Sequence, residues 1–300
     1  MPVKSFENVT WKAAAHIILC AFALAAVMPF VLLIAASFTD NNTALAQGFS
    51  FLPKKLSLDA YVYIVREWRT IGRAYFMTIL VTVSGTAISL IVTCMFAYAL
   101  SQGNLPGRNL LTFLCVFPML FNGGLVASYY VWSSVFQIKN TLWALIIPNL
   151  LMNTFNVILI KNYFQNSISP SILEAARIDG ISEFGLFVRI VMPLSVPLVA
   201  TIGLMGALAY WNDWTNGLYY LTERDGGQFY TIQLVLNSIN ENINFLANNS
   251  ELMSRANIQN LPSTTMRMAI AVIGILPILA AYPFFQQYFV KGITLGGVKE

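Results

Sequence analysis

Long apolar runs alternate with shorter polar connections along the whole chain. A helix that crosses a bilayer needs about 20 mostly apolar residues, and several runs reach that length. They cover residues 13–38, 74–100, 109–133, 141–160, 194–221 and 266–290. The pattern predicts an all-α membrane protein with six transmembrane helices, built as a single domain over residues 1–300.

The composition agrees with lipid as the main solvent. The chain is 57% hydrophobic and only 10% charged, and its mean hydropathy is +0.66. A soluble domain carries about 25% charged residues, so these charges are too few to cover a soluble surface. The net charge of +4 gives no reason to expect a nucleic-acid partner.

The connections between the apolar runs differ greatly in size. Residues 39–73 are expected to form a loop followed by an amphipathic helix, and residues 222–265 a long polar loop rich in Asn. If the apolar runs cross the membrane in turn, alternate connections lie on opposite sides. The Lys and Arg residues are then divided almost evenly between the two sides. The tendency of Lys and Arg to collect on the cytoplasmic side therefore does not give the orientation.

Catalytic and metal-binding chemistry finds little support in the sequence. The cysteines lie in apolar runs without metal-ligand spacing, and His16 is the only histidine. No phosphate-binding G-x-x-x-x-G-K-[ST] loop occurs. We therefore expect no catalytic residue, no metal site and no cofactor bound by this chain.

One polar segment, residues 167–193, interrupts the apolar pattern and has clear helix signals. Ser169 followed by Pro170 can begin a helix, and Ser171 with Glu174 fits a capping box. Gly180 supplies a left-handed stop. From these residues alone, a helix resting on lipid headgroups is as good a reading as a docking helix.

The expected surface of this segment favours a protein contact. One face of the first helix is expected to carry Ile172, Ala175, Ala176 and Asp179. The two alanines would leave a shallow surface that another protein can approach closely. A second short helix is expected after Ser182 and ends at Pro193.

The segment resembles the cytoplasmic "EAA" motif of ABC importer permeases: E-A-A, three residues, G, nine residues, I-x-L-P. Glu174, Ala175, Ala176 and Gly180 match, and the final "IVMP" ends at Pro193 with every spacing kept. The one departure is a methionine in place of the leucine, a change that conserves volume.

Two further stretches carry the same resemblance. The tail "QQYFVKGITLGGVKE" looks like that of the maltose-type inner permease superfamily, and it contains Gly292, Gly296 and Gly297. The final residue there is usually Gly, and here it is Glu300. "YWNDW" at residues 210–214 resembles the branch with complex-oligosaccharide, lipoprotein and alginate systems.

The resemblance implies a type I ABC importer permease fold with a cytoplasmic coupling helix. It implies a second homologous permease subunit, two ATPase subunits that carry ATP and Mg, and an extracytoplasmic sugar-binding protein. It places the chain in the bacterial cytoplasmic membrane with both termini in the cytoplasm. The residues expected to couple to the ATPase are Glu174, Ala175, Ala176, Asp179, Gly180, Gly292, Gly296 and Gly297.

Polar residues within the apolar runs are candidate contacts for a transported sugar, because such residues are costly in lipid. Asn149, Asn153 and Asn156 recur at helical spacing, and holding helices together is the commoner role of such residues. Trp211, Asn212, Asp213 and Trp214 combine ring faces with a carboxylate. The alternative is that this stretch belongs to the belt of aromatic residues found at the membrane interface.

These observations favour a permease that imports a sugar, with an oligosaccharide as the expected cargo and ATP hydrolysed on a partner chain. A secondary transporter of small polar solutes is the main alternative, although no internal repeat supports it. A membrane-embedded enzyme would need a cluster of acids, bases or metal ligands that the sequence does not offer.

Overall fold

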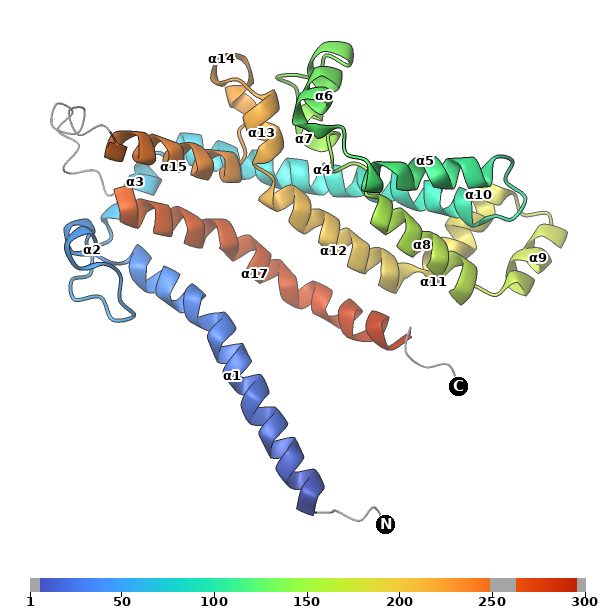
Figure 1. The fold of residues 1–300 in the computed structure, drawn as a ribbon, viewed down its shortest axis with the longest axis horizontal. Coiled ribbons are helices and arrows are strands. Elements are labelled where there is room, and N and C mark those ends of the chain that lie inside the picture. The colour runs from blue at the N-terminus through green and yellow to red at the C-terminus, as the bar shows by residue number, and fades with distance from the viewer. Residues whose placement is uncertain (1–5, 249–262, 296–300) are drawn as a thin grey trace. The chain divides into compact units, whose positions relative to one another are not determined.

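The structure is a computed structural model that describes residues 6–248 and 263–295. These residues form helices joined by turns (Figure 1), together with an isolated β-bridge between Thr39 and Leu56. The expected all-α class is confirmed. The chain divides into two compact units, residues 1–69 with 238–276, and residues 70–237 with 277–300.

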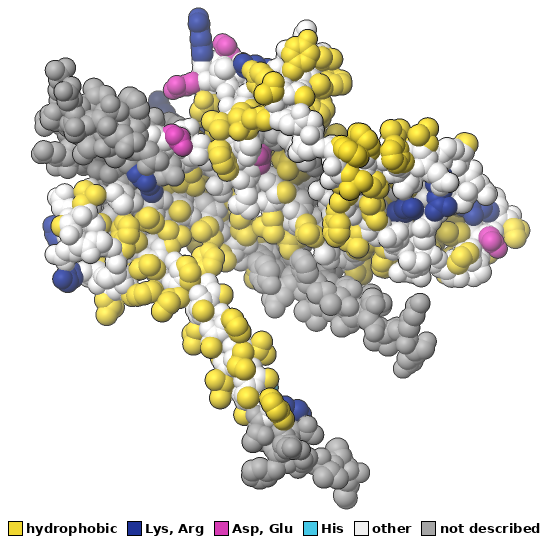
Figure 2. Space-filling model, viewed as in Figure 1, with side chains coloured by type: hydrophobic (Ala, Val, Ile, Leu, Met, Phe, Trp, Pro, Cys, Tyr) yellow, Lys and Arg dark blue, Asp and Glu magenta, His cyan; other side chains and the backbone are white. Residues whose placement is uncertain are grey.

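The first unit begins with a long apolar helix and a short folded connection. Its helices are α1 (Phe6–Ser37), α2 (Asn41–Gln47), α3 (Asp59–Arg66), the end of α15 (Ile232–Asn248) and the first half of α17 (Ser263–Leu295). The side chains along α1 are mostly hydrophobic and exposed (Figure 2), with Trp11 74% and Phe22 71% exposed. Such a helix is stable in lipid, because the bilayer keeps these apolar side chains out of water.

The connection after α1 is folded rather than open. The Asp40 carboxylate accepts hydrogen bonds from the backbone N–H and the hydroxyl of Thr43, at 3.2 and 3.0 Å, and so caps α2. The Thr43 hydroxyl and the nearby Lys55 ammonium lower the pKa of Asp40. The expected amphipathic helix is α3, which buries Ala60 and Ile64.

The second unit contains the polar segment 167–193. Its helices are α4 (Trp68–Ser101, from residue 70), α5 (Arg108–Leu120), α6 (Gly124–Tyr130), α7 (Trp143–Ile146), α8 (Thr154–Ser167), α9 (Pro170–Ile178), α10 (Glu183–Leu186), α11 (Met192–Leu194), α12 (Val196–Asn212), α13 (Thr215–Tyr220), α14 (Glu223–Gly226), the start of α15 and the end of α17. Two π-helical turns, residues 131–135 and 187–191, and one 3-10 turn, residues 227–229, connect them.

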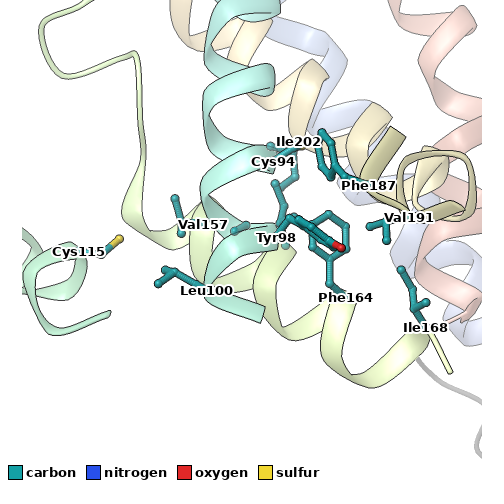
Figure 3. Close-up of a cluster of buried hydrophobic side chains, with 12 residues drawn as sticks. Cys94, Tyr98, Leu100, Cys115, Val157, Phe164, Ile168, Phe187, Val191 and Ile202 are labelled. Carbon is teal, nitrogen blue, oxygen red and sulfur yellow. The ribbon is translucent and has the colours of Figure 1, made fainter. Parts of the chain in front are cut away.

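The core of this unit lies where α4, α8 and α12 meet the residues after α10. Tyr98 is 8% exposed, and its ring lies between those of Phe164 and Phe187 (Figure 3), with ring centroids 6.4 and 5.2 Å away. Buried aliphatic side chains from all of these elements surround the three rings. The core therefore fixes the end of α4 against the polar segment that follows α8.

Fewer continuous spans are present than the sequence pattern predicts. Among the described residues, the helices long and apolar enough to cross a membrane are Trp11–Ser37, Trp68–Ser101 and Thr264–Ala281. A bent pair, Glu183–Leu194 with Val196–Asn212, gives a fourth if it is taken as one span. The count of six is therefore not reached by continuous helices and stays a prediction.

Local breaks account for the difference. The stretch expected at 109–133 is divided between α5 and α6, because Gly124 adopts φ +80° and the Asn122 side chain accepts a hydrogen bond from its N–H at 2.8 Å. The stretch expected at 141–160 is divided between α7 and α8 by Asn149, whose φ is +61°. A helix cannot continue through a left-handed residue.

The helical stretch Glu183–Leu194, which ends with α11, meets α12 at an angle of 84°. Pro193 and Pro197 lie on either side of Ser195, where the helix breaks. Each proline removes a backbone donor and crowds the carbonyl four residues earlier, so the helix bends there. The predicted start of the span at 194 is close to this bend.

The segment 222–265 is not simply a polar loop. It contains α14 and α15, and α15 buries Ile232 and Leu234. The expectation of a loop is wrong for this part, because apolar residues at helical spacing lie among the asparagines.

Candidate coupling segment and substrate pathway

The segment 167–193 begins as expected, but its cap differs. Ser169 precedes α9 and Pro170 is its first residue. The hydroxyls of Ser169 and Ser171 bond to each other at 2.7 Å, and the Ser169 side chain makes no capping bond to the helix backbone. The capping box suggested by Ser171 and Glu174 is not seen.

Gly180 ends α9 in the left-handed conformation predicted for it, with φ +81°. The N–H of Ile181 donates to the carbonyl of Ala176 at 3.1 Å, and the N–H of Gly180 donates to that of Arg177 at 3.0 Å. These two bonds form a Schellman motif and satisfy carbonyls at the end of the helix. Because no atom lies within 4 Å of the place of a Cβ at Gly180, only the left-handed backbone conformation favours glycine here.

The second helix is capped as expected. The Ser182 hydroxyl accepts a hydrogen bond from the N–H of Gly185 at 3.2 Å, which fixes the start of α10. Its buried face is formed by Leu186, Phe187 and Val191. The chain therefore makes a tight turn of fixed geometry between two short helices.

A group of polar side chains joins this turn to the end of α4. Arg177 Nε donates to Glu183 Oε1 at 2.8 Å, and Arg177 also donates to Glu183 Oε2 at 3.3 Å and to Gln102 Oε1 at 2.7 Å. The Tyr98 hydroxyl donates to Glu183 Oε2 at 2.9 Å. The hydrogen bond that Arg177 donates to Glu183 raises the pKa of the Arg177 guanidinium. We call these four residues the Glu183 network.

The Glu183 network was not predicted from the sequence. Arg177 and Glu183 lie six positions apart, across a glycine turn, and Tyr98 is 85 positions before Glu183. Helical periodicity pairs residues three or four apart, so it cannot find this group. The charge of Glu183, in a short helix between apolar spans, was the only signal.

The exposed face of α9 is not the one expected. Glu174, Ala175 and Asp179 are exposed, whereas Ala176 is 6% exposed and packs inward. Ile178 is 86% exposed. The prediction that Ala175 and Ala176 share one outward surface is therefore wrong, because α9 buries the face that carries Ala176.

The C-terminal part of the expected coupling set lies at the edge of the described chain. Gly292 lies in the last turns of α17, which ends at Leu295. Gly296 and Gly297 lie outside the described residues. Their assignment stays a prediction.

The three asparagines of the expected fourth span do not share one helical face. Asn149 lies in the turn before α8, and Asn153 is the N-cap of α8, where its side chain accepts a hydrogen bond from the N–H of Asn156 at 3.2 Å. Asn156 is the third residue of the helix, within its first turn. The expectation of a continuous Asn face is wrong, because the helix begins only at Thr154.

The residues of "YWNDW" have different environments. Trp211 is 7% exposed, whereas Trp214 is 41% exposed. The amide of Asn212 donates to the carbonyl of Leu208 at 2.9 Å. Asp213 Oδ1 accepts from the N–H groups of Thr215 and Asn216, at 3.1 and 3.3 Å, so its carboxylate caps α13.

Asn216 connects the turn of Asn149 with the turn of Asp213, and it was not singled out from the sequence. It is 3% exposed, and its amide donates to the carbonyl of Pro148 at 2.9 Å. The turn that contains Asn149 is therefore held against the turn that contains Asp213. The D-x-x-N spacing of a capped helix could have drawn attention to it.

A groove between α4 and α12 offers a contrast to these polar turns. Its volume is about 580 Å³. The lining is mostly aliphatic, from Val83, Leu90, Val196 and Val199 among others, with only threonine hydroxyls as polar groups. A sugar needs hydrogen-bond partners for its hydroxyls, so the polar turns suit a sugar better than this groove does.

Comparison with known proteins places the chain in a family. A family model described as "Binding-protein-dependent transport system inner membrane component" matches residues 74–295. The "Polygalacturonan/rhamnogalacturonan transport system permease protein YtcP" of Bacillus subtilis (strain 168) is 39% identical over 278 residues, which cover 93% of this chain and 94% of that protein.

Solved structures give the same result. A bacterial ABC transporter involved in the import of the acidic polysaccharide alginate has a chain with a TM-score of 0.80 and 30% identity, covering 96% of this chain and 100% of that one. A bacterial alginate ABC transporter in complex with an alginate pentasaccharide-bound periplasmic protein has a TM-score of 0.61. At 13% identity over 93% of both chains, this second likeness shows the fold alone.

The matched model covers most of the chain, and the relative and the first structure cover nearly all of it. Members of this family are membrane permease subunits and not enzymes. The apolar helices agree with a multi-pass membrane protein. The chain belongs to the binding-protein-dependent transport system inner membrane component family, the membrane permease subunits of ABC transporters.

Proposed function

We propose that this chain is a permease subunit of an importer that carries an oligosaccharide across the bacterial cytoplasmic membrane. ATP is hydrolysed on a separate chain. Family membership supports the class, and the names of the relative and the solved structure, which concern polygalacturonan, rhamnogalacturonan and alginate, support a carbohydrate of several units.

The segment 167–193 is the part that couples to the ATPase in this proposal. The observation that carries it is a short helix whose end is fixed by Gly180 and by the Glu183 network, while Glu174, Ala175 and Asp179 stay exposed. A helix held in one orientation with free polar side chains suits docking. Ala176 contributes by packing α9 onto its own bundle.

The proposed assembly has a second homologous permease, two ATPase subunits that bind ATP and Mg, and an extracytoplasmic sugar-binding protein. Both termini then lie in the cytoplasm, and six spans cross the membrane. In this arrangement α5 with α6, and α7 with α8, each make up one span that is interrupted by a turn. Gly292, Gly296 and Gly297 are proposed to reach the ATPase from the C-terminal tail.

The sugar pathway is proposed to run past the two polar turns. Asn149, Asn153 and Asn156 supply amides on one side, and Asn212, Asp213 and Trp214 supply polar groups and a partly exposed ring on the other. Asn216 holds the turns together. Trp211 belongs to the same stretch, and its 7% exposure suits a supporting position.

The experiment is uptake by the whole assembly in proteoliposomes. The permeases, the ATPase and the binding protein are copurified, and entry of labelled oligouronides and neutral oligosaccharides is followed with and without ATP. We expect entry only with ATP, and no ATP hydrolysis by this chain alone. Sugar entry driven by an ion gradient, without any copurified ATPase, would instead support the secondary transporter.

A further inference from the structure

The Glu183 network closes a ring of hydrogen bonds between the turn after α9 and the end of α4. Glu183 receives donors from Arg177 and Tyr98, and Arg177 donates in turn to Gln102, one position beyond α4. Both oxygens of the Glu183 carboxylate are used. The two halves of the ring come from parts of the chain that are more than 70 positions apart.

The ion pair alone would be a weak link. The Arg177 and Glu183 side chains are 37% and 59% exposed, and exposed pairs contribute little to stability. The difference here is the third partner, because the Tyr98 hydroxyl comes from a buried ring. The Tyr98 hydroxyl donates a charge-assisted hydrogen bond to the carboxylate, and its buried ring holds the donor in place, whereas the exposed Arg177 side chain is not held in this way.

Tyr98 cannot move independently of α4. Its ring is enclosed by Phe164 and Phe187 (Figure 3), so only the hydroxyl reaches the edge of the core. Glu183 is the first residue of α10, directly after the capped turn. The hydroxyl therefore ties the start of α10 to one point on α4.

Apolar side chains also hold α9 against the bundle. Ala176 is buried, and Leu173 packs at the edge of the core. The hydrophobic effect has no preferred direction, so apolar burial alone fixes the position of a helix less sharply than added hydrogen bonds do. Hydrogen bonds in a closed ring resist sliding of the helix.

We infer that Glu183 and the Tyr98 hydroxyl are positioning residues that transmit movement of α9 to α4 during transport. The inference deepens the proposed function and rests on it. A displaced α9 carries Arg177 and Glu183 with it, and the Tyr98 bond moves the end of α4. Without that bond the ATPase can still dock and turn over, and less sugar moves for each ATP hydrolysed.

The test uses Tyr98→Phe, which deletes one oxygen and keeps the ring in the core. The matched control is Tyr75→Phe on the same helix, because the buried Tyr75 hydroxyl has no hydrogen-bond partner among the described residues. The measurement is sugar imported per ATP hydrolysed by the complete assembly, beside recovery of the ATPase. We expect that ratio to fall about tenfold in Tyr98→Phe, with normal ATPase recovery, and to stay unchanged in Tyr75→Phe.

A second variant keeps the inference falsifiable if Tyr98→Phe assembles poorly. Glu183→Gln retains an oxygen for the Tyr98 hydroxyl but loses the ion pair, so we expect a smaller fall in the ratio. The double variant Tyr98→Phe with Glu183→Gln should be no worse than Tyr98→Phe alone, because both changes act on one network. A wild-type ratio in Tyr98→Phe, or multiplied losses in the double variant, would overturn the inference.

The outcomes also separate this inference from the proposed function. If the wild-type assembly imports sugar with ATP and Tyr98→Phe does so equally well, only the role of the Glu183 network is wrong. If the wild-type assembly shows no ATP-driven import, the proposed function fails and the inference fails with it.

Discussion

The ring of Tyr210 lies directly against Gly85. A Cβ added at Gly85 would come within 2.6 Å of Tyr210 Cε1, which is closer than packed carbon atoms approach. The Tyr210 hydroxyl donates to the carbonyl of Ile146 at 2.9 Å, so the ring cannot easily move away. One buried tyrosine thereby connects α4, α12 and α7, and glycine at position 85 makes this possible.

We expect Gly85→Ala to destabilise the protein. The added methyl group must displace a buried, hydrogen-bonded ring, and overpacking of this kind costs about 1–3 kcal/mol. Thermal unfolding of the purified protein in detergent measures the effect. Gly206→Ala is the control, because a Cβ there would lie 3.9 Å from Thr86 Cγ2 and would fit. Equal midpoints of thermal unfolding for the two variants would contradict the prediction, because they would mean that the Tyr210 ring can move aside at no cost.

We expect Gly180→Val to abolish uptake and weaken recovery of the ATPase, while the protein still inserts into the membrane. A β-branched residue in the left-handed conformation costs roughly 1–2 kcal/mol, which is enough to change the turn but not to unfold a bundle. Gly180→Asn is the control, since asparagine adopts this conformation more readily. The measurements are pull-down of the ATPase and sugar uptake, made on both variants. Equal ATPase recovery and equal uptake in Gly180→Val and Gly180→Asn would contradict the prediction.

We expect Glu174→Lys to reduce ATPase recovery without changing the thermal midpoint. Glu174 is exposed on α9, so reversing its charge alters the docking surface and disturbs little else. Glu223→Lys reverses an exposed acid on α14, outside the coupling segment, and serves as the comparison. The prediction fails if both substitutions lower ATPase recovery to the same degree.

Asp213 has a structural role that must be separated from any contact with sugar. Asp213→Ala removes the cap of α13 and should cost about 1 kcal/mol of stability. Asp213→Asn keeps an oxygen for the N–H groups of Thr215 and Asn216 and removes the charge. We expect normal assembly and about tenfold lower uptake in Asp213→Asn. Wild-type uptake in this variant would show that the residue only caps the helix.

The helical class and the turn at Gly180 could be predicted because they depend on local chemistry. Apolar runs of sufficient length give helices in lipid, and a glycine after a capped helix gives a left-handed stop. The residue types and spacings of the EAA motif identified the family for the same reason. Each of these signals is contained in a short piece of sequence.

The broken spans and the Glu183 network could not be predicted in this way. Hydropathy averages over a window, so it cannot detect that Asn149 adopts φ +61° and interrupts a helix. The approach of Tyr98 to Glu183 depends on how α4 packs against the residues after α10, which involves distant parts of the chain. The burial of Ala176 also depends on distant parts of the chain, since packing decides which face of a short amphipathic helix is buried.

The 84° bend at Ser195 has a mechanical consequence. The helices before it and the span after it form two arms of an angled lever, with the backbone between Pro193 and Pro197 as its corner. A force applied along the first arm produces a torque on the second. Sideways travel of the coupling segment would then emerge as a change in the tilt of α12, and the stiffness of that proline corner would set how much tilt each ångström of travel produces.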